Sequence, residues 1–293
     1  MIGAPADDDD VRAWVDELGV PGLFDAHVHF LPKPIMDRVW DHFDSAGPLI
    51  GRTWPIKYRM SDEQRVATLR ALGVRRFTAL PYAHKPGVAA YLNEWAGRFA
   101  NEHDDNIWSA TFFPEPGAPA YVRELIDEGA EVFKVHLQVG DFDPRDAAID
   151  EVWAALAESQ TPVVVHAGSG PVPGRHTGAG PIGDVLERHP RLSMIIAHMG
   201  APEYADFLAL AEAYDGVRLD TTMAFTDFFE DAAAYPRDLL PRLRDLEHKI
   251  LLGSDFPNIP YAYAHQLEAL VRLDLGDDWL RSVCWHNASR LFG

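Results

Sequence analysis

Four side chains able to bind a divalent metal ion occur at the ends of apolar segments in this sequence. His27 and His29 form a His-x-His pair, and the alternation of side chains along a strand places both imidazoles on one face. His166 ends one later apolar run, and Asp255 ends another. Neutral imidazole nitrogens and a carboxylate oxygen are ligands that zinc accepts at roughly 2 Å. We therefore predict one divalent metal ion, zinc by default and manganese, iron or cobalt as alternatives, bound by these four residues.

Three further ionisable side chains stand in runs that are otherwise apolar. His198 closes the run Ile195-Ile196-Ala197, and Lys134 and His136 alternate with apolar residues in another run. Buried parallel strands are usually almost purely apolar, so these residues require a reason. A buried lysine is costly unless it is neutral, modified or paired, which favours a function over simple packing. Either Lys134 or His136 is expected to reach the site.

The elements that must position these residues are short strands alternating with helices. Each apolar, β-branched run is followed by a polar or Gly/Pro turn and then a helical pattern, which predicts parallel strands in repeated βα units. Ser61, with Gln64 three residues later, predicts the start of one helix through a capping box. The eight predicted strands are residues 23–30, 76–82, 107–113, 132–138, 162–166, 193–198, 217–222 and 250–255.

A single closed (β/α)8 TIM barrel of the metal-dependent hydrolase type explains this α/β pattern better than two domains, because no linker or change of composition divides the series. Closure pairs the eighth strand with the first and brings Asp255 next to His29. We predict one domain over residues 1–293, with residues 1–20 partly disordered or peripheral. Residues 31–60 are expected to form an insertion that caps the barrel mouth, with an ordinary packed helix or a subunit contact as the alternative.

The composition narrows the class of partner. The chain of 293 residues has 26 Lys or Arg and 45 Asp or Glu, a formal charge of −19. Phosphate backbones are bound mainly through Lys and Arg, so nucleic acid is an unfavourable partner. The single cysteine allows no internal disulfide, and no apolar run is long enough to cross a membrane, which favours a cytoplasmic protein. We expect a small-molecule substrate without a nucleic-acid or membrane partner, and leave a homo-oligomer open.

Five motifs spread over nearly the whole chain carry a family resemblance. They are Asp25-Ala26-His27-Val28-His29, Val164-Val165-His166-Ala167-Gly168, Ile196-Ala197-His198-Met199-Gly200, Gly253-Ser254-Asp255-Phe256-Pro257 and Asn287-Ala288-Ser289-Arg290-Leu291-Phe292. With them the chain resembles the amidohydrolase superfamily. The resemblance is to its amidohydrolase-related branch, which includes aminocarboxymuconate-semialdehyde decarboxylase as well as hydrolases and lactonases.

This resemblance implies roles for individual residues. The three histidines of the predicted centre would be metal ligands, Asp255 would be both a ligand and a proton carrier, and His198 would be a catalytic group near the substrate. Some superfamily members carry a carbamylated lysine or a glutamate on the fourth strand, where it bridges two metals. This chain has Lys134 and His136 there. We favour one metal, with Lys134 or His136 contacting the substrate.

Two reactions fit these residues. In the favoured one, the metal lowers the pKa of bound water, Asp255 accepts its proton, and the hydroxide attacks the carbonyl of an amide, ester or lactone while His198 steadies the oxyanion. In the second, the same metal orients an unsaturated or aromatic acid for non-oxidative decarboxylation. A decarboxylase needs a cation for the substrate carboxylate, and Arg175 in a Gly-rich loop and Arg52 in the insertion are candidates.

Trp54 in the insertion and Tyr82 near a strand end are candidates to line the substrate pocket. They suit a small, partly apolar or aromatic molecule, although ordinary packing uses the same residue types. A metal-dependent deoxyribonuclease also uses a His-x-His barrel, but the negative charge and the missing fourth-strand glutamate argue against it. A catalytically silent scaffold is expected to have lost metal ligands, and none is lost here.

Overall fold

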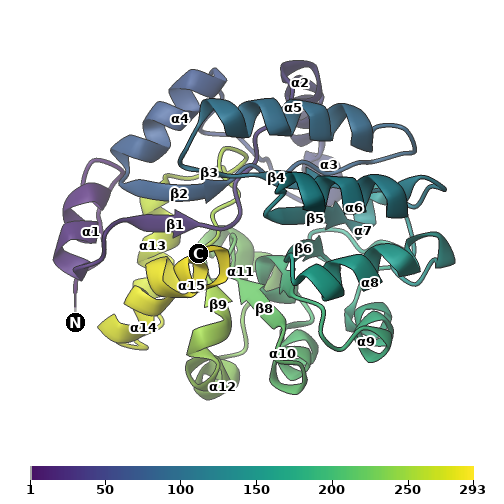
Figure 1. The fold of residues 1–293 in the computed structure, drawn as a ribbon. Helices are drawn as coiled ribbons and strands as arrows, with labels where there is room; N and C mark the ends of the chain where they lie inside the picture. Colours follow the sequence, from purple (N-terminus) through teal and green to yellow (C-terminus); the bar gives the residue numbers. More distant parts are fainter. Residues whose placement is uncertain (1) are drawn as a thin grey trace. The chain divides into compact units, whose positions relative to one another are not determined.

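The computed structural model describes residues 2–293 and divides them into two compact units. The terminal unit comprises residues 2–77 together with 220–293, and the central unit comprises residues 78–219. In each unit, short parallel strands alternate with helices along the chain, as Figure 1 shows. The predicted α/β class with parallel strands is therefore confirmed.

In the terminal unit, the segment that carries the His-x-His motif runs parallel to the segment that carries Asp255. Strand β1 (Leu23–Asp25) pairs in parallel with β2 (Val74–Thr78). Beyond β1, the backbone continues alongside the segment that follows β9 (Ile250–Leu251). The hydrogen bonds of this ladder run from Ala26 N to Leu252 O, from Asp255 N to His27 O and from His29 N to Phe256 O. This register is what places the His-x-His motif next to Asp255.

The central unit contains an array of parallel strands paired in chain order. These are β4 (Ser109–Thr111), β5 (Val132–His136), β6 (Val163–His166), β7 (Met194–Ile196) and β8 (Val217–Asp220), whose last residue belongs to the terminal unit. Lys134 lies opposite Val164, and His136 lies opposite His166. Two imidazoles from adjacent strands therefore stand side by side where β5 and β6 end.

The described residues also contain fifteen α-helices. In the terminal unit they are α1 (Val11–Leu18), α2 (Lys33–Ser45), α3 (Gly47–Ile50), α4 (Asp62–Ala71), α11 (Asp227–Ala233), α12 (Leu240–Asp245), α13 (Tyr263–Val271), α14 (Asp277–Arg281) and α15 (Asn287–Phe292). In the central unit they are α5 (Ala89–Glu102), α6 (Ala118–Glu128), α7 (Leu137–Gly140), α8 (Asp150–Ser159), α9 (Ala179–Arg188) and α10 (Tyr204–Ala213). Helix α5 packs against β4, and α6 packs against α8 (Figure 1). Across residues 2–293, the structure holds no helix with the length and apolarity needed to span a membrane.

Each of the eight predicted strands contains strand residues, but the strands are shorter than the apolar runs. The third run is divided at Trp108 into β3 (Asn106–Ile107) and β4. Ser109 explains the division, since its hydroxyl donates to Ile107 O at 2.8 Å and accepts from Ala79 N at 3.1 Å, replacing contacts that a regular ladder makes. The capping box at Ser61 is confirmed, with Gln64 N donating to Ser61 Oγ and Ser61 N donating to Gln64 Oε1.

Residues 31–60, the predicted insertion, contain α2 and α3 and are fixed to the segment that carries Asp255. Trp40 Nε1 donates to Asn258 Oδ1 at 3.1 Å, and Trp54 Nε1 donates to Asn258 O at 2.7 Å. Asn258 lies three residues after Asp255, and its own N–H donates to Asp255 O at 2.8 Å. Two indoles of the insertion therefore bind directly beside a predicted site residue.

The acidic start of the chain is largely exposed, but Asp8 makes defined contacts. Its carboxylate accepts hydrogen bonds from the Tyr58 hydroxyl at 2.5 Å and from Ala264 N at 3.0 Å. The Tyr58 hydroxyl also accepts a hydrogen bond from Tyr263 N at 2.7 Å. Asp8 thus joins the insertion to the first turn of α13, and the adjoining helix α1 contributes Trp14 among its buried residues.

Candidate functional site

Three of the four predicted metal ligands meet in the terminal unit. His27 Nε2 lies 3.2 Å from His29 Nε2, and Asp255 Oδ1 lies 3.0 Å from His29 Nε2 and 3.6 Å from His27 Nε2. All three side chains are buried. Two ligands at roughly 2 Å from one ion in a tetrahedral arrangement are about 3.3 Å apart. The three donor atoms therefore have the spacing of ligands that share one metal ion. Two imidazoles and a carboxylate are also ligand types suited to a divalent metal ion.

Asp255 reaches this position through an uncommon backbone conformation. Its φ is 69°, in the left-handed region that Gly, Asn and Asp tolerate better than other residues. Gly253, two residues earlier, has no room for a side chain, because a Cβ there would lie 2.1 Å from Thr222 Oγ1 and 2.8 Å from His27 Cβ. The backbone at Gly253 therefore lies directly against His27, and two residues later the Asp255 carboxylate lies beside both imidazoles.

Asp25 fastens the His-x-His segment to the Asp255 segment. Its Oδ2 accepts hydrogen bonds from Ser254 Oγ at 2.5 Å and from the Tyr263 hydroxyl at 2.8 Å. Its Oδ1 accepts from the backbone N–H groups of Ser254 at 3.1 Å and His27 at 3.2 Å. Complete burial raises the pKa of Asp25 to about 7, although these hydrogen bonds act in the opposite direction. This structural role was not apparent from the sequence.

Asp220, at the end of β8, is a further buried acid that no sequence motif indicated. Its Oδ2 lies 2.8 Å from His27 Nδ1, and neither side chain is accessible to solvent. An acid near the end of an apolar strand is the same signal that marked Asp255, but Arg218, two residues earlier, offers an apparent partner. In the structure, Arg218 instead donates to Ser193 Oγ and Gly216 O.

The other predicted imidazoles gather in the central unit. The rings of His136 and His166 are stacked, with centroids 3.8 Å apart and an angle of 11° between their planes. The His198 ring lies 4.7 Å from that of His166. His166 Nε2 lies 3.0 Å from Gly170 O, and a carbonyl oxygen can only accept a hydrogen bond. In the neutral ring, Nε2 therefore carries the hydrogen and Nδ1 keeps the lone pair that a metal ion requires.

The predicted residues of the fourth strand lie on β5. Lys134 is buried, with 1% of its surface exposed, and His136 is half-buried. Val139 N donates to His136 Nδ1 at 3.3 Å, so that Nε2 of the neutral ring carries the hydrogen and can donate it. The Tyr82 ring is centred 5.5 Å from the His136 ring. The alternation along β5 places Lys134 and His136 on one face of the strand.

His198 lies in a tight turn after β7. Its φ is 56°, and that of Met199 is 55°, so two consecutive residues adopt the left-handed region. The loop after His166 packs against this turn, because Gly170 N donates to Ala201 O at 3.0 Å and a Cβ on Gly168 would lie 2.3 Å from that same oxygen. Such conformations in non-glycine residues persist only where the surroundings hold them, which is common at functional sites.

The candidates for substrate binding outside the clusters differ in their surroundings. Arg175 is exposed in the central unit. Arg52, in the terminal unit, is half-buried with its guanidinium 4.2 Å from the centre of the Phe228 ring, and it has no carboxylate partner among residues 2–293. Trp54 is buried against Phe43 and Phe228, and its N–H is taken by a backbone carbonyl. Trp54 therefore offers an aromatic surface without a free hydrogen-bond donor.

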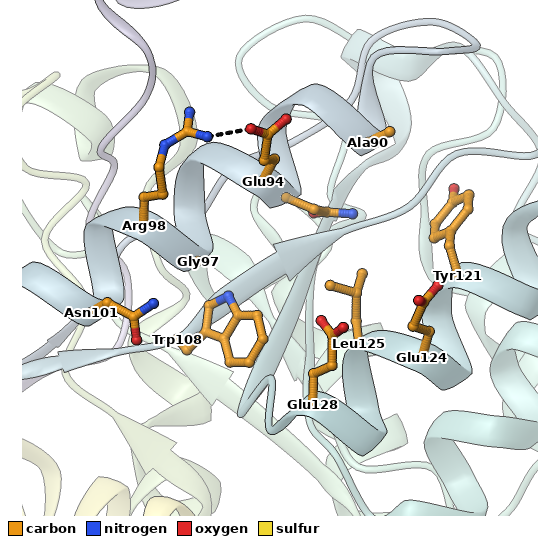
Figure 2. Close-up of a pocket in the computed structure, with 11 residues that line it drawn as sticks. Ala90, Glu94, Gly97, Arg98, Asn101, Trp108, Tyr121, Glu124, Leu125 and Glu128 are labelled. Carbon is orange, nitrogen blue, oxygen red and sulfur yellow. Dashed lines mark hydrogen bonds and ion pairs between the residues drawn. The ribbon is translucent and has the colours of Figure 1, made fainter.

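A surface cavity of about 460 Å³ lies elsewhere in the central unit, between α5 and α6 with Trp108 beside it (Figure 2). Among the described residues that line it, none is a predicted site residue. Glu94 and Arg98 at its edge form an ion pair with each other, as Figure 2 shows. The described residues of this lining include no histidine or cysteine, so we assign the chemistry to the two histidine clusters instead.

Comparison with protein-family models identifies the family. The amidohydrolase model matches residues 24–293, and the chain therefore belongs to the amidohydrolase family. A search of curated protein sequences found no significant match. The family agrees with the resemblance carried by the five sequence motifs. The protein is thus an enzyme of the amidohydrolase superfamily.

Several solved structures have a similar fold. An uncharacterized TIM-barrel protein from Bordetella bronchiseptica has 17% identity and a TM-score of 0.71, over 92% of this chain and 98% of that chain. A 5-carboxyvanillate decarboxylase from Novosphingobium aromaticivorans, complexed with manganese and 4-hydroxy-3-methoxy-5-nitrobenzoic acid, has 15% identity and a TM-score of 0.64, over 94% and 97%. A probable 2-pyrone-4,6-dicarboxylic acid hydrolase from Acinetobacter baumannii, with citric acid bound, has 14% identity and a TM-score of 0.61, over 94% and 100%. These similarities confirm the TIM-barrel fold, and the neighbours include both decarboxylases and hydrolases.

Proposed function

We propose that this protein is a metal-dependent hydrolase that opens an amide, ester or lactone bond of a small molecule. The observation that carries the proposal is the convergence of His27 Nε2, His29 Nε2 and Asp255 Oδ1 at distances of 3.0–3.6 Å. His166, described in the central unit, is proposed as the fourth ligand, and its lone pair on Nδ1 supports that role. Zinc is the metal to test first, with manganese next because it is present in the similar decarboxylase.

A divalent ion bound by these residues would supply Lewis-acid chemistry, polarising a carbonyl group and lowering the pKa of a water molecule. Asp255 accepts the proton that the water loses as it attacks the carbonyl carbon. The same carboxyl group then returns the proton to the leaving nitrogen or oxygen as that bond breaks, so that no covalent enzyme intermediate is required.

Residues of the central unit are proposed to handle the substrate. His198 steadies the oxygen that becomes negatively charged during attack, and the Nε2–H of His136 is a suitable donor to a polar group of the substrate. Lys134, on the same face of β5, is the alternative contact. The fixed tautomers of His136 and His166 mean that these rings need no proton rearrangement before they act.

The proposal is tested by supplying the purified protein with zinc or manganese and a panel of lactones, esters, amides and unsaturated or aromatic acids. We expect stoichiometric release of a new carboxylate from at least one lactone, ester or amide, without CO2. The Asp255→Asn variant, with its metal content measured in parallel, should lose at least about 1,000-fold in kcat. Full activity of that variant would exclude the proton-transfer role.

A second candidate function is non-oxidative decarboxylation of an unsaturated or aromatic acid. The observation that favours it is Arg52, a guanidinium stacked on Phe228 that has no carboxylate partner among residues 2–293. A guanidinium that is held on an aromatic ring and is not paired with a carboxylate of the described residues is suited to bind a substrate carboxylate through two parallel hydrogen bonds. An acidic group would then protonate the carbon that loses CO2.

For this alternative, CO2 release is measured with the same panel of acids. Arg52→Ala should lower kcat/KM about 100-fold, because loss of a charged hydrogen-bonded pair costs about 2–3 kcal/mol. Arg98→Ala is the matched control, since Arg98 forms a surface ion pair with Glu94. Hydrolysis without CO2, unaffected by the Arg52 substitution, would exclude decarboxylation through this residue.

A further inference from the structure

Asp220 is a buried acid in direct contact with the predicted metal ligand His27. Its Oδ2 lies 2.8 Å from His27 Nδ1, and its Oδ1 accepts a hydrogen bond from Thr222 N at 3.1 Å. Asp220 and Thr222 are completely buried, as is His27. Both oxygens of this carboxyl group therefore have specific partners, which fix its orientation against the ring of His27.

We propose that Asp220 is a positioning residue that holds His27 in the tautomer and the orientation required of a metal ligand. A carboxylate can only accept a hydrogen bond, so His27 Nδ1 must carry the hydrogen that it donates to Asp220. The other ring nitrogen, Nε2, then keeps its lone pair. That nitrogen is the atom that lies 3.2 Å from His29 Nε2 and 3.6 Å from Asp255 Oδ1. The inference rests on the proposed metal centre and adds a residue to it.

The backbone at Gly253 packs closely on His27 and Asp220 and restricts the movement of the His27 ring. A Cβ added to Gly253 would lie 2.8 Å from His27 Cβ, 3.4 Å from Asp220 Cβ and 2.1 Å from Thr222 Oγ1. The segment leading to Asp255 is therefore packed directly on the pair formed by His27 and Asp220. Within the terminal unit, His27, Asp220 and the backbone at Gly253, two residues before the predicted metal ligand Asp255, are therefore closely packed together.

The charge of Asp220 adds to its geometric effect. Histidines that bind metals commonly donate their second N–H to a carboxylate, which increases the basicity of the ligating nitrogen. Removal of such a partner typically weakens metal binding about 10- to 100-fold. We expect the same range for Asp220→Asn, because an asparagine can accept the hydrogen bond from His27 Nδ1 but carries no charge.

The first experiment measures zinc affinity by competition with a chromophoric chelator in the wild type, Asp220→Asn and Asp215→Asn. Asp215 is an exposed acid five residues away and serves as the matched control. Asp220→Asn should bind zinc about 10- to 100-fold more weakly, whereas Asp215→Asn should match the wild type. Thermal unfolding of the metal-free proteins is recorded in parallel. Wild-type affinity in a folded Asp220→Asn protein would overturn the proposal.

The second experiment needs no variant and separates this inference from the proposed function. In metal-free wild-type protein with 15N-labelled histidine, the His27 ring should give the spectrum of the tautomer protonated at Nδ1, assigned by its absence in His27→Gln. The opposite tautomer would overturn the role of Asp220. If the wild type binds neither zinc nor manganese, the metal centre is wrong, whereas the His27 spectrum still decides whether Asp220 holds the ring.

Discussion

The Tyr263 hydroxyl donates a hydrogen bond to Asp25 Oδ2 across 2.8 Å, although the two residues are 238 positions apart in the chain. Both side chains are completely buried. Tyr263 is the first residue of α13, and Asp25 ends β1. This contact, with the one from Ser254, attaches the segment containing both histidines of the motif to the part of the chain that supplies Asp255.

Removing this hydrogen bond should destabilise the protein without changing its net charge. Tyr263→Phe is expected to lower the free energy of unfolding by about 2 kcal/mol, because a buried acid loses one donor and the cavity is small. Urea unfolding monitored by tryptophan fluorescence measures the change. Tyr91→Phe, at an exposed position on α5, is the control and should have no measurable effect. Equal stability of the two variants would contradict the structural role of Asp25.

Gly253→Ala should damage the site even though it adds only a methyl group. The added Cβ would overlap Thr222 Oγ1 at 2.1 Å and press on His27. Overpacking of this kind typically costs about 1–3 kcal/mol, and we expect weakened metal binding as well. The control is Gly183→Ala in α9, where the nearest atom is 3.8 Å away. Gly253→Ala should have a lower melting temperature and a lower metal content than Gly183→Ala. Equal values for the two variants would argue against the close packing of Gly253 on His27 and Thr222.

The ion pair between Asp143 and Arg145 should give a pH-dependent contribution to stability. Hydrogen bonding to Arg145 lowers the pKa of Asp143 to about 2. Because the folded-state pKa lies below the unfolded one, the contribution is present above about pH 4 and is lost as the pH falls through about 2.

Asp143→Asn should therefore lower the free energy of unfolding at pH 6 by about 0.5 kcal/mol, a small value because the pair is partly exposed and screened by salt. The difference from the wild type should disappear near pH 2, and it should shrink in 1 M salt. Asp215→Asn, at an exposed position, provides the comparison. A difference that grows as the pH falls would have the wrong sign.

Cys284 should be unreactive in the folded protein. It is the one cysteine of the chain, and burial raises the pKa of its thiol to about 12. The thiolate is the reactive form, so almost none is present at neutral pH. A disulfide reagent such as dithionitrobenzoate should react slowly with native protein and release one equivalent per chain in urea. Rapid reaction under native conditions would mean that this region opens readily.

Removal of metal should lower the melting temperature if the proposed centre is correct. A ligand at about 100 times its dissociation constant stabilises the folded state by about 2.7 kcal/mol. A chelator should therefore reduce the melting temperature of the zinc-loaded wild type by several degrees. His29→Ala should show no such shift, whereas His248→Ala, at an exposed position, should behave as the wild type. A chelator effect that persists in His29→Ala would place the metal elsewhere.

The parallel α/β fold could be predicted because apolar runs and turns repeat along the whole chain. The proximity of His29 to Asp255 could also be anticipated, since barrel closure brings the first and last strands together. The strand lengths were overestimated, as at Trp108, because a single hydroxyl from Ser109 redirects the backbone hydrogen bonds. Such local competition between a side chain and a strand is not visible in an apolar pattern.

The contribution of Asp220 and the tautomers of the imidazoles could not be predicted. Asp220 is separated from His27 by 193 residues, and Arg218, two residues before Asp220, is the nearest opposite charge in the sequence. The tautomer of His166 depends on the carbonyl of Gly170, which any residue would supply at that position. The sequence does place an acid at the end of this strand, but the pairing of Asp220 with His27 and the two tautomers follow from the path of the backbone, which residue types and spacing do not show.

The hydrogen bond between Asp8 and Ala264 has a consequence for synthesis on the ribosome. Its two partners are 256 residues apart, and at about 5–20 residues per second the second partner follows the first by roughly 13–50 s. During this interval Tyr58 has Asp8 within the nascent chain but lacks its donor Tyr263 N, and the indoles of Trp40 and Trp54 lack Asn258 until residue 258 has been added. The histidine pair likewise lacks Asp255 until residue 255 has been added, so the nascent chain cannot complete this site before that point.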